Sequence, residues 1–163
     1  MDREIAENVT AERVRRVSEG YTNAKDQAIS GLGGGFQFCR LSEAPLFNAD
    51  GAIRDDVGFA ELAEFVWFAE TGQGRVPPPG RGKRKPSSPL LGTFEGRAIY
   101  LLYNGILKDR SVDGGNVLTG PLLDLLPAHD GPKVIYAAAC RMGAARRARE
   151  QIVFKHTPYA LDL

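Results

Sequence analysis

The sequence has few of the residues that bind metal ions or form disulfide bridges. Its 163 residues include two cysteines and two histidines. Cys39 and Cys140 lie in runs of apolar or small residues, and neither has a cysteine or histidine at the spacing of zinc ligands. Two cysteines in a chain of this length also exclude the disulfide framework of small secreted domains. We expect both thiols to be reduced and buried, as free cysteines commonly are.

Long apolar runs and an excess of one charge are absent as well. No stretch approaches the ~20 apolar residues of a membrane span, and the polar, charged residues 1–16 do not resemble a secretory signal. The formal net charge is +1, which is too small for a chain-wide attraction to nucleic acids. The sequence therefore predicts a cytoplasmic protein without membrane contact, and any contact with DNA must come from a local basic patch.

Motifs that signal a catalytic site are missing too. The chain has no Gly-x-Ser-x-Gly elbow and no Walker-type phosphate loop. The glycines of residues 30–35 are spaced like part of a dinucleotide-binding loop, but a strand-like run follows at 36–41, where that loop requires a helix. His129 and His156 have no cysteine or carboxylate at ligand spacing. No residue is therefore predicted to be catalytic or to bind a cofactor or metal ion.

Composition and periodicity predict a folded domain of the α/β or α+β class. Hydrophobic residues make up 43% of the chain and charged residues 25%, as in ordinary globular proteins. We expect a small mixed sheet of four to five strands covered by helices, with an N-terminal helical arm. Strands are expected near 36–41, 93–103, 133–139 and 152–155. Helices are expected near 57–70, 116–126 and 142–150. The expected N-caps are Thr10, Asp55 or Asp56, and Thr119.

Two domains of unequal size are predicted. Residues 1–30 form the arm, whose helix begins after Thr10 and ends at Gly20. This helix is short and mostly polar, so it needs something to pack on. Residues 31–163 form the α/β domain, in which the basic segment 72–89 is a flexible loop because proline, glycine and serine dominate it.

Two basic regions are candidates for contact with DNA phosphates. The first is the loop at 72–89, which carries positive charges and no acid. The second is the outer side of the helix near 142–150. In both, a solvated surface is the alternative interpretation. The candidate nucleic-acid-binding residues are Arg81, Lys83, Arg84, Lys85, Arg146 and Arg149.

Five segments, in this order, resemble one family. They are TAERVRRVSEGY (10–21), GGGFQFCRL (33–41), FAELAEFVWFAETG (59–72), YLLYNGIL (100–107) and IVFKHTPY (152–159). Together they are similar to the C-terminal region of site-specific adenine DNA methyltransferases, including the modification subunits of type III restriction–modification systems.

The resemblance implies that the chemistry lies upstream of this region. In the family, an Asp-Pro-Pro-Tyr-type motif receives the flipped adenine and a Phe-x-Gly-x-Gly-type loop holds S-adenosylmethionine; this sequence has neither. Methyl transfer needs donor and acceptor held in line and a pocket for the extruded base. S-adenosylmethionine is therefore expected only in the complete enzyme. The helix after Thr10 is expected to pack on the cofactor-binding sheet.

The resemblance implies the C-terminal portion of an adenine-N6 DNA methyltransferase that is inactive alone. It implies a fragment, a separately encoded half or a gene remnant. The expected partners are DNA and the catalytic region or the restriction subunit. Two alternatives stay open. One is a stand-alone DNA-binding module. The other is a small α/β enzyme with its site in the loop 108–116, which follows a buried strand as sites in open α/β sheets do.

Overall fold

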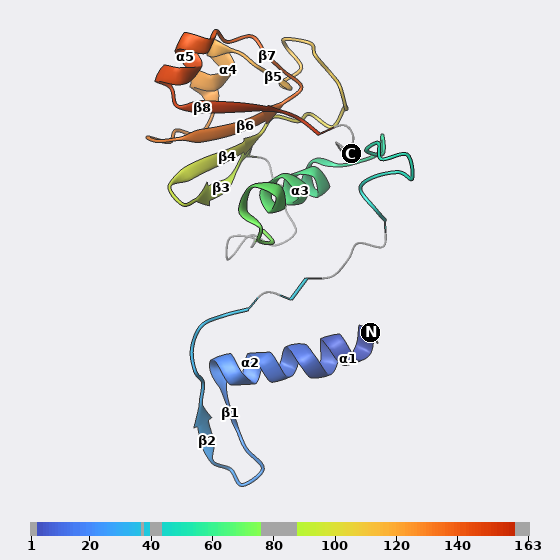
Figure 1. Cartoon of the computed structure of the whole chain (residues 1–163), viewed down its shortest axis with the longest axis vertical. Helices are drawn as coiled ribbons and strands as arrows, with labels where there is room; N and C mark the ends of the chain where they lie inside the picture. The colour runs from blue at the N-terminus through green and yellow to red at the C-terminus, as the bar shows by residue number, and fades with distance from the viewer. Residues whose placement is uncertain (1–2, 37, 40–43, 76–87, 159–163) are drawn as a thin grey trace. The chain divides into compact units, whose positions relative to one another are not determined.

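The computed structural model describes residues 3–36, 38–39, 44–75 and 88–158. The chain divides into two compact units, Met1–Ser42 and Glu43–Leu163, which we call unit 1 and unit 2. In the described residues, no helix is long and apolar enough to cross a membrane. Figure 1 shows unit 1 in blue and unit 2 from cyan to red.

Unit 2 is built on a four-stranded mixed sheet, so the predicted α/β class is confirmed. The order of its strands is β3-β4-β6-β8, with β3 antiparallel to β4 and the other neighbours parallel. A tight turn at Glu95–Gly96, with positive φ at both residues, joins β3 to β4 as a hairpin. The strands are β3 (Leu90–Phe94), β4 (Arg97–Leu101), β6 (Lys133–Ala137) and β8 (Ile152–His156).

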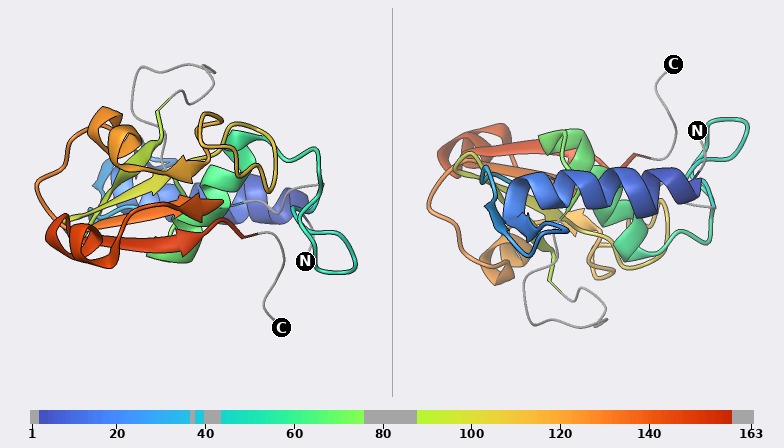
Figure 2. Two further views of the ribbon diagram at one scale, coloured as in Figure 1. Left: turned by 90° about the horizontal axis from the view of Figure 1, so that it is seen from above. Right: turned by 90° about the horizontal axis from the view of Figure 1, so that it is seen from below.

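Helices cover both faces of this sheet. Helix α3 lies on one face, and α4 and α5 lie on the other (Figures 1 and 2). Two short strands, β5 and β7, pair in parallel beside them. Each face has its own apolar core, one with Leu62 and Val66 of α3 and one with Tyr100 and Ile135. The elements are α3 (Phe59–Thr71), α4 (Gly120–Leu125), α5 (Ala144–Arg149), β5 (Val117–Leu118) and β7 (Ala139–Cys140).

The helix caps of unit 2 differ in part from the expected ones. Thr119 caps α4 as predicted, because its hydroxyl accepts a hydrogen bond from the Leu122 N–H at 3.2 Å. The predicted cap of α3 at Asp55 or Asp56 is wrong. That helix begins after Gly58, whose N–H donates to the Glu61 carboxylate at 2.8 Å. The predicted helix near 116–126 is shortened, since its first residues form β5.

Unit 1 consists of one long helix and a hairpin. The helix has three parts, α1 (Arg3–Ile5), the π turn η1 (Ala6–Thr10) and α2 (Ala11–Glu19). The predicted cap at Thr10 is wrong, because Thr10 is helical and its side chain makes no cap hydrogen bond. The helix ends at Gly20, with φ 91°, as predicted. The hairpin pairs β1 (Gly20–Thr22) with β2 (Ala28–Ser30).

None of the described residues of the segment 36–41, where a strand was predicted, lies in a strand. Phe36, Phe38 and Cys39 lie outside every strand, and residues 37, 40 and 41 are not among those the structure describes. A strand needs a neighbour for its N–H and C=O groups, and no described strand pairs with these three residues. The expectation that Cys39 is buried is also wrong, since Cys39 is exposed, while Cys140 is half-buried.

Candidate functional site

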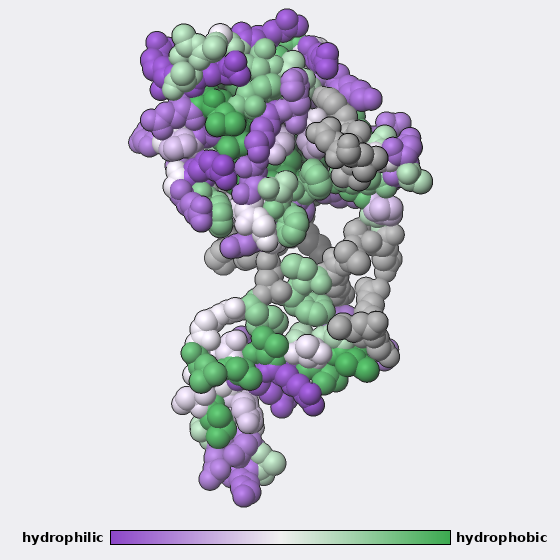
Figure 3. Space-filling model, in the orientation of Figure 1, coloured by the Kyte–Doolittle hydropathy of each residue, from purple (hydrophilic) through white to green (hydrophobic). Residues whose placement is uncertain are grey.

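Exposed apolar side chains are concentrated on unit 1. No described residue of this unit is buried. Among the described residues, fourteen large hydrophobic side chains are exposed; nine of them belong to unit 1, and each of these nine is at least 39% exposed. Figure 3 shows several strongly hydrophobic groups on its surface. We call these nine residues the arm surface: Ile5, Val9, Val14, Val17, Tyr21, Ile29, Leu32, Phe36 and Phe38.

The π turn affects how the apolar residues of the helix are arranged. Val9 and Val14 are five positions apart, which in a regular α-helix separates two side chains by about 140°. The π turn between them takes up part of this rotation, since the Ala11 N–H donates to the Ala6 carbonyl five residues back. Ile5 and Val9 therefore turn toward the side that carries Val14 and Val17. This arrangement favours a common surface over scattered apolar positions.

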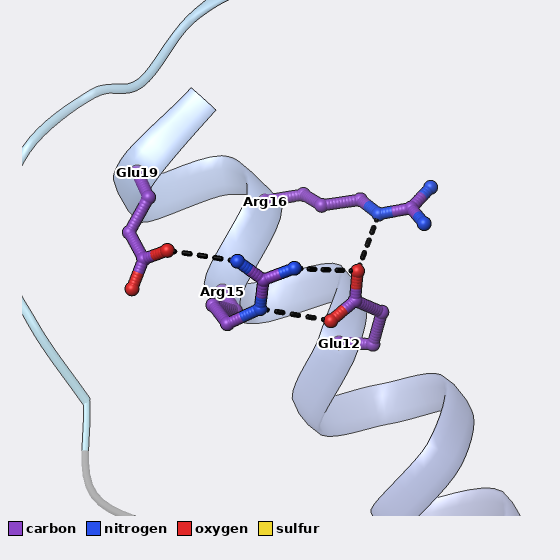
Figure 4. A network of polar contacts seen from close by, with 4 residues as sticks. All are labelled: Glu12, Arg15, Arg16 and Glu19. Carbon is purple, nitrogen blue, oxygen red and sulfur yellow. Dashed lines mark hydrogen bonds and ion pairs between the residues drawn. The ribbon is translucent and has the colours of Figure 1, made fainter. Parts of the chain in front are cut away.

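The charged side of α2 is neutralised within the helix (Figure 4). Arg15 donates to both oxygens of Glu12 at 2.8 and 2.9 Å and to Glu19 at 2.8 Å, and Arg16 donates to Glu12 at 2.7 Å. These hydrogen bonds from Arg15 and Arg16 lower the pKa of Glu12 to about 2. Exposed pairs of this kind stabilise a helix little. Because two acids balance two cations, this network does not require a charged partner.

Main-chain hydrogen bonds hold the helix and hairpin of unit 1 together. The Leu32 N–H donates to the Val17 carbonyl at 2.9 Å, and the Gly33 N–H donates to the Ser18 carbonyl at 3.1 Å. Gly31 passes so close to the end of the helix that a Cβ there would lie 2.2 Å from the Ser18 oxygen. Unit 1 therefore has secondary structure and satisfied turns, but its described residues form no hydrophobic core.

The most buried carboxylate of unit 2 joins α3 to the sheet. The Glu70 side chain is 3% exposed and accepts hydrogen bonds from the Tyr136 hydroxyl at 2.8 Å and the Lys155 ammonium at 2.5 Å. Arg97 lies 3.4 Å from its other oxygen. Burial by itself raises the pKa of Glu70, but the hydrogen bonds from Lys155 and Tyr136 outweigh it and hold the pKa below the usual value. Burial and the Glu70 hydrogen bond raise the pKa of Tyr136.

This cluster is a satisfied ion pair and not a set of reactive groups. The Glu70 carboxylate is ionised and fully engaged, so it is not available to take a proton from a substrate. No sequence pattern pointed to it, because Glu70, Tyr136 and Lys155 come from three elements up to 85 positions apart. Its role in the described structure is to hold the C-terminal end of α3 against β6 and β8.

The loop 108–116, which is the predicted site in the small-enzyme alternative, is held by several hydrogen bonds. Asn116 is buried; its side chain accepts from the Asn104 N–H at 2.5 Å and donates to the Ile106 carbonyl at 3.0 Å. Asp109 accepts hydrogen bonds from Ser111 and from the Asn104 side chain, which lower its pKa. These side chains are therefore engaged with one another and with the main chain of the loop.

A cavity of about 360 Å³ opens beside this loop at the carboxyl end of β4. Its lining is mostly apolar and includes Phe59, Leu122 and Leu126, together with the polar Ser88 and Asn104. The residues that the structure places around it include no carboxylate, imidazole, thiol or amine. The cavity has the position of a site in an open α/β sheet, but the one ionisable group in its described lining is the Tyr103 hydroxyl, which donates to the Val57 carbonyl at 2.8 Å.

The candidate DNA-binding residues are only partly covered by the structure. Arg81, Lys83, Arg84 and Lys85 lie outside the described residues. Arg146 contacts Asp124 at 3.1 Å and Glu150 at 3.9 Å and packs beside Gly120, so it ties α5 to α4. Arg149 is exposed. Among the described residues, no group of three or more His, Cys, Asp or Glu is arranged to hold a metal ion.

Comparisons with known proteins give no identification. No protein-family model matches the chain, and no curated protein sequence and no solved structure is similar to it. The resemblance to adenine DNA methyltransferases therefore stays a prediction from the sequence, and the function has to be argued from the geometry.

Replacing Glu70 tests the role of the buried carboxylate. At neutral pH, Glu70→Gln should lower the free energy of unfolding by about 1–2 kcal/mol, because two cations and a hydroxyl lose a charged acceptor. The pKa of Glu70 is lower in the folded chain than in the unfolded chain. Its carboxylate therefore stabilises the folded state at pH values above the unfolded pKa, and this stabilisation is lost as the pH falls through the folded pKa. The difference between variant and wild type should therefore shrink below about pH 4.

Urea unfolding at pH 7 and pH 3.5 measures this difference. Glu64→Gln, on the exposed side of the same helix, is the matched control and should leave stability unchanged. An equal loss for Glu70→Gln at both pH values would contradict the role of its charge.

Proposed function

We propose that this chain is the C-terminal portion of a site-specific adenine-N6 DNA methyltransferase of a restriction–modification system. In this proposal it serves assembly with the catalytic region and is not catalytic alone. The observation that carries the proposal is the arm surface. Unit 1 exposes nine large apolar side chains and, in its described residues, buries none.

Physical arguments support a partner for unit 1. A helix of this length and a two-stranded hairpin are each marginally stable in water without tertiary packing. Burial of one Val, Leu, Ile or Phe side chain contributes about 1.5–3 kcal/mol, so covering the arm surface would stabilise the unit considerably. The sequence resemblance implies which partner this is, because in that family the segment like residues 10–21 packs on the sheet of the catalytic region.

The residues present do not fit S-adenosylmethionine. The Phe-x-Gly-x-Gly loop is absent from the sequence, and the cavity beside β4 has no carboxylate in its described lining to bind ribose hydroxyls. The cofactor would supply the methyl group in the complete enzyme, and this chain would contribute packing surface. Unit 2, in which the buried polar groups hold layers together, fits an accessory domain.

Charge substitutions on the arm surface test the assembly role. The probe is a purified methyltransferase chain that carries the Asp-Pro-Pro-Tyr and Phe-x-Gly-x-Gly motifs and ends before a segment like residues 10–21. We expect this chain to bind it, and Val14→Asp/Val17→Asp to weaken binding by at least about 100-fold, because buried unpaired charges are costly. Isothermal titration calorimetry gives the dissociation constants.

Asn8→Asp, on the same helix and exposed, is the control and should bind like the wild type. Unchanged binding by the double valine variant would show that the arm surface is not the contact. Absence of any binding by the wild-type chain would contradict the proposed function.

Titration with S-adenosylmethionine tests the division of labour. The chain alone should give no binding heat, since no described group and no motif forms a cofactor site. The complex with the catalytic chain should bind the cofactor. Stoichiometric binding by the isolated chain would contradict the proposal and require that this chain be treated as an enzyme.

A DNA-binding module is the second candidate, and one observation favours it. Of the four arginines at 141–149, Arg146 alone forms an ion pair with a described carboxylate, whereas Arg141, Arg147 and Arg149 form none. Cations without acidic neighbours are suited to phosphate contact.

Fluorescence anisotropy with a duplex of about 20 base pairs tests this candidate. Affinity should fall steeply between about 50 and about 200 mM salt, and Arg147→Glu/Arg149→Glu should weaken binding and flatten the salt dependence. Glu64→Gln, on the exposed side of α3, serves as a control for substitution elsewhere. If the arginine variant binds as the wild type does, α5 does not contact DNA.

A further inference from the structure

The chain that follows the hairpin of unit 1 has the pattern of a strand but no neighbour. Phe36 and Phe38 are two positions apart, so in a strand their side chains would point to the same face. In the structure they are 44% and 43% exposed and lie outside every described strand. Aromatic residues favour strands because they pack well on a pleated, partly buried surface. No described strand offers Phe36 and Phe38 such a surface to pack on.

The geometry of unit 1 places the residues just before this segment next to the end of the helix. The main-chain bonds from Leu32 to Val17 and from Gly33 to Ser18 bring the chain back to the last turn of α2. Gly33 and Gly34 then have φ values of 75° and 81° with no atom within 4 Å of a built Cβ, so the chain can change direction before Phe36. In layered α/β proteins a helix covers the sheet to which the adjoining strands belong. Unit 1 has such a helix and a strand-like segment, but the one sheet among its described residues is the two-stranded hairpin β1-β2.

We propose that the segment containing Phe36 and Phe38 becomes an added edge strand in the sheet of the catalytic region, on which the arm surface of the helix also packs. This inference rests on the proposed function and specifies how the two chains join. Strand addition uses main-chain hydrogen bonds for affinity and alternate side chains for specificity. It would give the N–H and C=O groups of the segment partners in that sheet and bury both phenylalanines in one step.

The sheet of unit 2 is a less suitable acceptor, in the same chain or in a second copy. Its edge strand β3 has a β-bulge between Leu90 and Gly92, and bulges discourage pairing at an edge. Its other edge strand, β8, carries Lys155, whose ammonium group donates a hydrogen bond to Glu70 of α3, which covers one face of the sheet. Inward-pointing charges and lysines are devices that protect edge strands from pairing. A separate sheet therefore fits the segment better.

Amide hydrogen exchange tests the strand directly. The probe is the catalytic chain used for the binding experiment, and exchange is followed at Phe36, Phe38 and Cys39 of the full chain. These amides should exchange rapidly in the free chain. Successive N–H groups of a strand point to opposite edges, so either Cys39 or its neighbour Phe38 should exchange at least about tenfold more slowly in the complex.

Variants separate strand addition from binding in general. Phe36→Asp/Phe38→Asp should weaken binding at least about tenfold, whereas Lys25→Asp in the hairpin turn should have no effect. If the complex forms but all three amides exchange as in the free chain, strand addition is wrong and the proposed function stands. If the wild-type chain binds no catalytic chain, both proposals fail. Slow exchange in the free chain at every concentration would overturn the inference in favour of pairing within the chain.

Discussion

Burial of strand β4 on both faces is the constraint on which unit 2 depends. Its residues from Ala98 to Leu101 are at most 1% exposed. Because successive side chains of a strand point to opposite faces, a strand without polar positions must be covered twice. Helix α3 covers one face, and α4 and α5 cover the other. Crossover helices return the chain in the same direction, so β4, β6 and β8 are parallel.

Polar side chains of unit 2 hold these layers in place. Glu70 links α3 to β6 and β8, Asn116 shapes the loop after β4, and Arg146 links α5 to α4. Each is engaged with protein groups, and a polar group engaged in this way is not available to a substrate. The chemistry of the described residues is that of a scaffold.

Unit 1 presents the opposite balance of interactions. Its main-chain groups are paired in a helix and hairpin, and the charges of Glu12, Arg15, Arg16 and Glu19 are matched. Its described apolar side chains remain unburied. A hydrogen bond within the protein replaces one that the same groups make with water in the unfolded chain, so it adds little net free energy to folding. The burial of apolar surface is the main contribution that stabilises a folded domain. Unit 1 therefore has the secondary structure of a protein domain, but its described residues lack the buried apolar surface that stabilises a domain.

Local signals in the sequence determined much of the architecture. The turn at Glu95–Gly96, the cap at Thr119 and the helix end at Gly20 follow from short-range preferences, and the apolar runs near 98–103 and 133–137 identified buried strands. Tertiary structure alone decided the rest. The contacts of Glu70 with Tyr136 and Lys155 join distant elements, and alternation at Phe36 and Phe38 shows only that a strand is feasible. The physical reason is that conformational preference is a property of neighbouring residues, whereas pairing and burial require a partner surface that sequence neighbours do not provide.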